Sequence, residues 1–184
     1  MRLYAGSSQQ FMDDTYQNRI ADKLRESFFR QLGHMPPDGE VHAWQNSLRA
    51  ASMVFEHANL SDHGVIVEYQ LPLSSKRLDC MVCGKDGATK DNAVIIELKQ
   101  WETCKVTDGE REVLAWVGGA EREVLHPSVQ AGQYRMYFGD GQTVFYEEPD
   151  PVILNACAYL HNYRAHAEDP LFSEKFREML ESTP

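Results

Sequence analysis

The residues most suggestive of chemistry stand in one apolar segment, Val94-Ile95-Ile96-Glu97-Leu98-Lys99. Because alternate residues on a strand face the same side, Glu97 and Lys99 are expected to project together. Ile96 and Leu98 are then expected to face the opposite way, into the core. Burying either charge alone costs several kcal/mol, so the pair needs a partner or a bound ion. An exposed ion pair is the plainer interpretation of Glu-x-Lys, whereas the preceding Val and Ile residues favour a functional site.

A second carboxylate comes from the preceding predicted strand, in Arg77-Leu78-Asp79. The polar loop over residues 84–91 lets this strand pair with residues 93–99 as a hairpin, so Asp79 can approach Glu97. Two carboxylates beside a lysine suit Mg²⁺, which prefers oxygen ligands and takes one or two carboxylates together with substrate phosphate. A lysine at such a site can orient or deprotonate an attacking water. These residues therefore predict metal-assisted hydrolysis of a phosphodiester bond.

Glu68 is a further candidate ligand, on the first of three predicted strands. If Leu71 and Lys76 close the hairpin between the first two strands, equal steps back along both strands place Glu68 opposite Asp79. Directly opposed residues have Cβ atoms about 4.5–5.5 Å apart, so two carboxylates there repel each other unless a cation lies between them. A register slip of one residue would turn Glu68 to the other face.

The elements that must position these residues begin with a helical first third. Ser7 and Gln10 have the spacing of a capping box. Two apolar stripes at helical spacing follow, the first ending at Gly33 and the second near Asn59. Their residues are Phe11, Ile20, Leu24, Phe28 and Leu32, then Val41, Trp44, Leu48, Ala51 and Phe55.

Alternating and helical patterns then predict a mixed α/β domain. Three short strands joined by tight turns form an antiparallel meander, and a helix opens at His126-Pro127, where proline suits the first helical position. The predicted strands are 65–71, 77–82, 93–99, 143–146 and 152–159, and the predicted helices after the meander are 127–138 and 171–181.

The helix over residues 127–138 adds a third group of polar residues. It contains Gln130-Ala131-Gly132-Gln133-Tyr134, and residues four apart on a helix share a face. Together with Asp79 and Glu97-Leu98-Lys99, the Gln130-x-x-x-Tyr134 pattern resembles the PD-(D/E)XK nuclease superfamily, and in particular its RecB-type branch.

The wider sequence is similar to the nuclease-like module that precedes Schlafen-type helicase domains in bacterial and phage proteins. The similarity spans about residues 40–165. Its segments are Glu68-Tyr69-Gln70-Leu71-Pro72, Lys76-Arg77-Leu78-Asp79, Ile96-Glu97-Leu98-Lys99-Gln100-Trp101, His126-Pro127-Ser128-Val129-Gln130 and Tyr159-Leu160-His161-Asn162-Tyr163.

The resemblance implies a restriction-endonuclease-like α/β (α+β) fold, a mixed sheet flanked by helices with an N-terminal helical lead-in. The whole chain, 1–184, is then expected to be a single nuclease domain. Its expected parts are a helical N-terminal part over 1–62, a PD-(D/E)XK-like core over 63–165 and a C-terminal helix over 166–184.

The resemblance also implies a role for each site residue. Asp79 and Glu97 are expected to ligate Mg²⁺ or Mn²⁺, with the Leu98 carbonyl as a third ligand and Glu68 as an additional one. Lys99 activates or positions the water, and Gln130 holds that lysine or a phosphate. Tyr134 steadies the DNA strand or the same network. The expected nucleic-acid contacts are Lys76, Arg77, Gln100 and His161. Lys76 and Arg77 could instead be solvated surface charges. His161 could instead have a structural role.

Composition and charge limit the possible partners. The chain has 184 residues, of which 42% are apolar and 25% charged, with a net charge of −10. Residues 1–60 contain seven acidic and six basic residues, whereas residues 61–184 contain 21 and 12. A protein that binds nucleic acid by bulk electrostatics usually has the opposite sign, so a DNA-binding role needs a metal site, a local patch or a partner.

Membrane-spanning proteins are excluded, since no apolar segment approaches the ~20 residues of a membrane span. The ordinary composition excludes the collagen-like and disordered classes. The sequence also lacks an N-terminal secretory signal. Four cysteines are too few for a disulfide framework, so reduced thiols in the cytoplasm are expected.

Three alternatives stay open. The first is a catalytically silent module of the same fold that docks nucleic acid or a helicase or other motor, because the chain has no nucleotide-binding loop of its own. The second is a cysteine-based metal or redox site built on Cys80-x-x-Cys83, for which buried thiols are the simpler interpretation. The third concerns residues 107–123, which form either a flap over the site or a solvated excursion.

Overall fold

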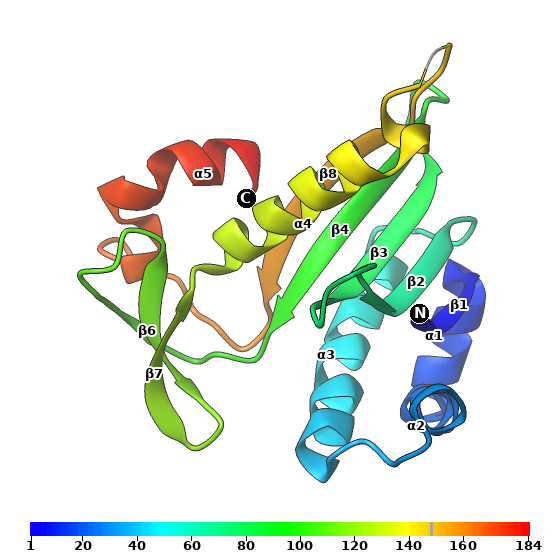
Figure 1. Cartoon of the computed structure of the whole chain (residues 1–184), viewed down its shortest axis with the longest axis horizontal. Helices are drawn as coiled ribbons and strands as arrows, with labels where there is room; N and C mark the ends of the chain where they lie inside the picture. The colour runs from blue at the N-terminus through cyan, green and yellow to red at the C-terminus, as the bar shows by residue number, and fades with distance from the viewer. Residues whose placement is uncertain (148) are drawn as a thin grey trace. The chain divides into compact units, whose positions relative to one another are not determined.

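The computed structural model describes residues 1–147 and 149–184, which form five α-helices and eight strands (Figure 1). The larger sheet has the strand order β1-β2-β3-β4-β8 and the smaller sheet the order β5-β6-β7. This mixed α/β architecture confirms the predicted fold class. No helix in the described part of the chain is long and apolar enough to cross a membrane.

The elements follow one another along the chain with these bounds: β1 Arg2–Ser7, α1 Ser8–Tyr16, α2 Ile20–Leu32, α3 Asp38–His57, β2 Gly64–Gln70, β3 Arg77–Lys85, β4 Asp91–Lys99, β5 Cys104–Val106, β6 Glu112–Val117, β7 Ala120–Leu125, α4 Pro127–Gly141, the 3-10 turn Thr143–Phe145, β8 Ile153–Leu160, the 3-10 turns Pro170–Phe172 and Glu174–Phe176, and α5 Arg177–Ser182. The chain divides into two compact units, residues 1–94 and 95–184, and β4 runs from the first into the second.

The first unit combines an antiparallel β1-β2-β3 arrangement with α1, α2 and α3. Its helices form where the apolar spacing predicts them, and the predicted capping box of Ser7 and Gln10 is present at the start of α1. Gly33 ends α2 in the left-handed conformation, with a φ of 77°. The apolar stripe predicted for α3 is buried, whereas Met53 and Val54, which lie outside that stripe, are exposed. The large side chains of this core include Phe11, Leu24, Leu48, Phe55, Val65, Val67 and Leu78.

Two predictions for the first unit are wrong. Residues 2–7 form an edge strand rather than part of a helical lead-in, because Tyr4 pairs with Val67 of β2 and so gains its partner from a distant segment. The first predicted helical stripe is also split into α1 and α2. Asn18 lies between them with a φ of 55°, and Leu32, at the end of the stripe, is 42% exposed.

In the second unit, α4 packs along β8, which lies beside β4 (Figure 1). Pro127 occupies the first turn of α4, as predicted. The helix continues through Gly141 instead of stopping at Gly139, since an interior glycine only costs about 1 kcal/mol and does not forbid a helix. The strand predicted over residues 143–146 is a 3-10 turn, Thr143–Phe145.

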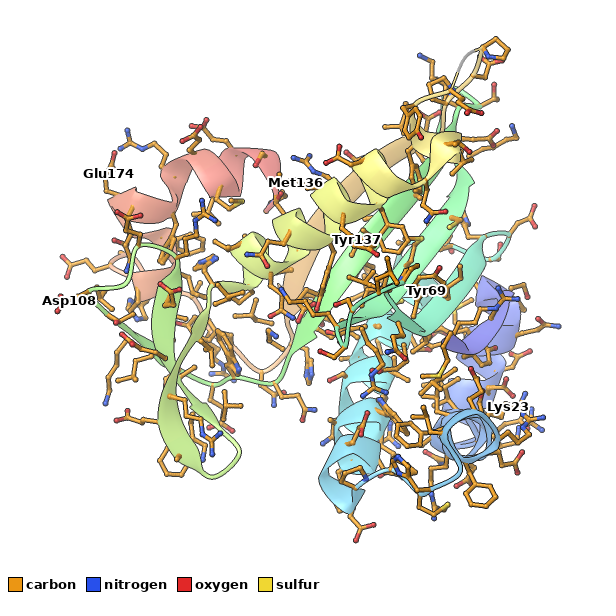
Figure 2. All side chains as sticks on the ribbon, in the orientation of Figure 1. Lys23, Tyr69, Asp108, Met136, Tyr137 and Glu174 are labelled. Atoms are coloured by element: carbon orange, nitrogen blue, oxygen red, sulfur yellow. The ribbon has the colours of Figure 1, made fainter. Side chains whose placement is uncertain are left out.

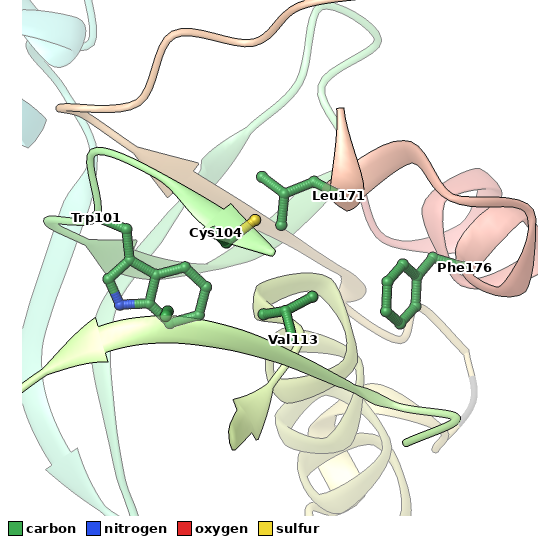
Figure 3. Packing of buried hydrophobic residues seen from close by; sticks show 6 residues of the cluster. Trp101, Cys104, Val113, Leu171 and Phe176 are labelled. Atoms are coloured by element: carbon green, nitrogen blue, oxygen red, sulfur yellow. The ribbon is translucent and has the colours of Figure 1, made fainter. Parts of the chain in front are cut away.

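Residues 107–123 contain β6 and part of β7, so this segment is ordered in the antiparallel β5-β6-β7 sheet. Its predicted role, a flap over the site or a solvated excursion, stays a prediction. One face of this sheet packs on the C-terminal turns. The resulting cluster contains Trp101, Cys104, Val113, Ala115, Leu171 and Phe176 (Figure 3). The predicted C-terminal helix is shorter than expected, because residues 170–176 form two 3-10 turns before α5 begins at Arg177.

Candidate active site

Strand β4 carries a buried carboxylate. Ala93, Ile95 and Glu97 alternate along its more buried face, and only 1% of the Glu97 side chain is exposed. The Lys99 Nζ donates a hydrogen bond to Glu97 Oε1 at 2.6 Å, which confirms that the two side chains project together. The predicted burial is only partly right: Leu98 is buried on the other face, but Ile96 is half-buried there. Glu97 is therefore enclosed with its lysine rather than displayed at a surface.

Helix α4 brings two more polar side chains to this pair. Gln130 Oε1 accepts a second hydrogen bond from Lys99 Nζ at 3.1 Å. The Gln130 Nε2 in turn donates to the Tyr134 hydroxyl at 3.1 Å, and Tyr134 is buried. The prediction that these two helical residues share a face is therefore confirmed. We refer to Glu97, Lys99, Gln130 and Tyr134 as the lysine cluster.

The lysine cluster fixes the direction of each hydrogen bond. Because the Lys99 ammonium can only donate, Gln130 must turn its oxygen toward Lys99, and this leaves its Nε2 to donate to the Tyr134 hydroxyl. An ammonium has three protons, of which Glu97 and Gln130 take two. Lys99 is thus held in one orientation from two sides, which is the arrangement expected of a group that positions a reactant rather than a solvated surface charge.

His126 anchors the start of α4 and was predicted only as the residue that opens the helix. Its Nδ1 accepts from the Ser128 backbone N–H at 3.1 Å, so its protonated Nε2 donates to the Leu171 carbonyl at 3.1 Å. Burial lowers the pKa of His126 to about 4, which keeps the ring neutral near pH 7. A neutral ring can accept at one nitrogen and donate at the other, so it places Gln130 one turn further along.

Two predicted nucleic-acid contacts lie beside Lys99 in the second unit. The His161 backbone N–H donates to the Lys99 carbonyl at 3.2 Å, and Asn162 donates to the Gln100 carbonyl at 3.4 Å. Burial lowers the pKa of His161, which favours the neutral form of this ring. The Lys99 Nζ also lies 5.6 Å from the centre of the Trp101 ring, within the range of a cation–π contact.

The first unit contains the predicted pair of carboxylates on β2 and β3. Leu71 N donates to the Lys76 carbonyl, and Val67 and Tyr69 pair with Cys80 and Leu78. This confirms the predicted register, which sets position 68 opposite position 79. Burial, followed by the negative charge of Asp79, raises the pKa of Glu68 to about 8.

The backbone and the partners of Glu68 are unusual for a strand residue. Its φ is 53°, in the left-handed region, which costs of order 1–3 kcal/mol for a residue that is not glycine. Arg77 pairs with Glu68 Oε2 at 3.2 Å and also with Glu40 of α3. The guanidinium opposes the rise in the Glu68 pKa but is outweighed by burial and Asp79. Arg77 is therefore held by carboxylates, whereas the neighbouring Lys76 is exposed.

Within residues 1–147 and 149–184, no group of three or more His, Cys, Asp or Glu side chains has the geometry of a metal site. The four cysteines are free thiols in the structure, and burial raises the pKa of Cys83, Cys104 and Cys157. Raised pKa values make these thiols poorer ligands and nucleophiles, so they support the interpretation as packing residues.

The residues of the predicted metal site nevertheless supply oxygen ligands, the type that a hard cation such as Mg²⁺ prefers. A carboxylate has about four lone-pair positions, so Glu97 can accept from Lys99 and also bind an ion. In the first unit, burial and then the charge of Asp79 raise the pKa of Glu68, so a cation bound between these two carboxylates would favour the charged form of Glu68. Asp79 belongs to the first unit and Glu97 to the second, so their predicted proximity stays a prediction.

No protein-family model, curated protein or solved structure matches the chain.

Proposed function

We propose that this protein is a metal-dependent nuclease that hydrolyses phosphodiester bonds in DNA. The observation that carries the proposal is the lysine cluster: a buried carboxylate paired with a lysine that a helix holds through a glutamine and a tyrosine. A structural ion pair needs only its two charges. The additional fixing of Lys99 by Gln130 favours a role in which the position of the ammonium matters.

The ligands we propose for Mg²⁺ or Mn²⁺ are the Glu97 carboxylate and the Leu98 carbonyl, with Asp79 and Glu68 as the further ligands that the resemblance implies. All four supply oxygen, the atom that these cations prefer. When bound by these residues, the ion would supply Lewis-acid stabilisation of charge on the phosphate and would lower the pKa of a bound water.

The residues of the lysine cluster have separate tasks in this proposal. The third N–H of Lys99 donates a hydrogen bond to the attacking water or to a phosphate oxygen, where negative charge develops during hydrolysis. The Glu97 carboxylate offsets the positive charge of the partly buried Lys99 ammonium. Gln130 and Tyr134 do not touch the substrate: they hold the ammonium in place, so they are positioning residues.

A catalytically silent docking module is the second candidate, and the net charge of −10 favours it. An acidic protein gains little from long-range attraction to DNA, so it would depend on a helicase or other motor to deliver the substrate. The two candidates differ in one observable, the breakage of phosphodiester bonds by the purified chain.

The test is incubation of the chain with circular duplex, linear duplex and single-stranded DNA, with Mn²⁺ or with EDTA. The proposal predicts products with Mn²⁺ that are absent with EDTA, and the substrate pattern separates internal from end-dependent cutting. Asp79→Asn, which removes a proposed ligand at nearly constant volume, is expected to abolish the products. Intact DNA on all three substrates would leave the docking module as the better account.

A further inference from the structure

A groove in the second unit begins at the residue after Lys99. It has a volume of about 420 Å³, within the range of small-molecule binding sites. One side is the segment that follows β4 and the other is the small sheet. Its lining residues are Gln100, Trp101, Glu102, Thr103, Cys104, Lys105, Leu114, Trp116 and Glu121.

Trp116 stands out in this groove because the sheet leaves it exposed. On β6, Val113 and Ala115 point into the buried cluster, so Leu114 and Trp116 project from the opposite face. The Trp116 side chain is 65% exposed, although an indole is among the largest apolar groups a protein can bury. Its cross-strand neighbour is Glu121, so the surface next to the ring is polar.

A second tryptophan links the groove to the lysine cluster. Trp101 is buried in the cluster beneath the small sheet (Figure 3). The centre of its ring lies 5.6 Å from Lys99 Nζ. The groove therefore contains a fixed ring beside the lysine and an exposed ring farther out. Gln100 and Thr103 add hydrogen-bonding groups between them.

Base stacking, and not charge, selects the form of ligand. Glu102 and Glu121 are exposed, and Lys105 is paired with Glu121, so the groove offers little free positive charge to the phosphates of either a duplex or a single strand. Binding here must therefore come from the bases. The base faces of a duplex are hidden by stacking, so a duplex offers Trp116 no face to contact. An unpaired base presents a flat face, which every nucleobase can stack on an aromatic ring.

We propose that this groove binds unpaired bases of single-stranded DNA, with Trp116 as the stacking platform. The proposal rests on the proposed function, because the groove would place the DNA strand beside Lys99. It also names single-stranded DNA as the substrate class of the nuclease. Binding itself does not require bond cleavage. The nuclease and the stacking groove can therefore fail separately.

The test is fluorescence anisotropy of a labelled oligothymidylate, with Ca²⁺ in place of Mn²⁺ to prevent cleavage. Trp116→Ala is expected to weaken binding roughly 5- to 100-fold, and Trp116→Phe, which keeps an aromatic face, only a few-fold. The matched control is Met136→Ala. Met136 lies on α4, is also 65% exposed, and projects from the helix in Figure 2. Its loss is expected to leave binding unchanged.

Three competitors define the specificity: a duplex of the same length, an oligouridylate, and unlabelled oligothymidylate. The proposal predicts that the duplex competes poorly and that the two single strands compete well. Equal binding by native protein and Trp116→Ala, equal competition by the duplex, or no binding of oligothymidylate would each overturn it. If native protein binds through Trp116 but never cleaves, the groove stands and the nuclease fails. If it cleaves and Trp116→Ala binds normally, the nuclease stands and the groove fails.

Discussion

Gln130 lies 31 residues after Lys99 in the chain, yet its Oε1 accepts a hydrogen bond from the Lys99 Nζ at 3.1 Å. The same amide donates to Tyr134 one turn further along the helix. Because one side chain joins the strand and the helix, a change in either element moves the ammonium. Variants of Lys99 and Gln130 are therefore expected to differ in their effects on the stability of the fold and on the rate of DNA cleavage.

Removal of Lys99 is expected to destabilise the fold, because Glu97 is buried and loses its ammonium. Lys99→Met is predicted to lower the free energy of unfolding by about 3 kcal/mol, the usual effect of breaking a buried ion pair. The double variant Glu97→Gln/Lys99→Met removes both charges and is expected to recover much of that loss. Urea unfolding of both variants measures the difference. Equal stability of native protein and Lys99→Met would show that Glu97 does not depend on this lysine.

Gln130→Ala is expected to impair activity more than stability. It removes one hydrogen bond to Lys99 and one to Tyr134, so unfolding changes by about 1–2 kcal/mol. The rate of cleavage is predicted to fall about 10- to 100-fold, because a misplaced reactive group is costly even when it stays present. A positioning role predicts a lower kcat with little change in KM. A raised KM at constant kcat would instead make Gln130 a substrate-binding residue.

Tyr134→Phe tests the outer end of the same network. It removes the acceptor of the Gln130 Nε2 bond while keeping the ring that packs in the core. We expect a loss of about 1 kcal/mol in stability and a smaller fall in cleavage rate than for Gln130→Ala. If Tyr134→Phe matched Gln130→Ala in rate, the hydroxyl would have to act directly on DNA.

Stability is expected to depend on pH through His126. Burial lowers the pKa of this imidazole from 6.5 to about 4 in the folded protein. Between these values the unfolded chain binds a proton that the folded chain does not. The free energy of unfolding therefore falls as the pH drops from 6.5 through 4, by up to roughly 3 kcal/mol, and the contribution is fully present above pH 6.5.

The control for that pH dependence is His126→Asn, which keeps a side-chain acceptor at the start of α4 but does not titrate. Urea unfolding between pH 4 and pH 7 is expected to show a shallower dependence for this variant. The same slope in both proteins would mean that another group controls acid unfolding.

Lys76 and Arg77 are neighbours with different expected roles. Arg77 pairs with Glu40 and Glu68, so Arg77→Met is predicted to cost about 2 kcal/mol in stability. Lys76 is exposed, and Lys76→Met is expected to change stability by less than about 0.5 kcal/mol. If Lys76 contacts a phosphate, its loss weakens DNA binding and lowers the salt dependence of binding by about one unit of slope. An unchanged salt dependence would remove it from the DNA contacts.

Much of the lysine cluster was predictable because its geometry is local. The period of two on a strand places Glu97 with Lys99, and the period of 3.6 on a helix places Gln130 with Tyr134. The hairpin closed by Leu71 and Lys76 sets the register of β2 and β3.

Features that depend on distant partners were not predictable in this way. β1 is a strand only because it pairs with β2, and its six residues carry too short a pattern to distinguish it from a helix. The positive φ of Glu68 and the ion pair between Arg77 and Glu40 of α3 have no signature in the local sequence pattern. The exposure of Trp116 follows from which face of β6 covers the C-terminal turns, and no local pattern encodes that choice.

The most direct test of the central claim is the rate of Mn²⁺-dependent DNA cleavage by native protein, Lys99→Ala and Lys90→Ala. Lys90 lies in the exposed loop between β3 and β4, so its variant removes the same charge away from the lysine cluster. We predict that Lys99→Ala lowers the rate at least about a hundred-fold, as expected for loss of a group that acts on the developing charge, while Lys90→Ala cleaves like native protein. Cleavage by Lys99→Ala at the native rate would contradict the claim that this lysine cluster is the active site.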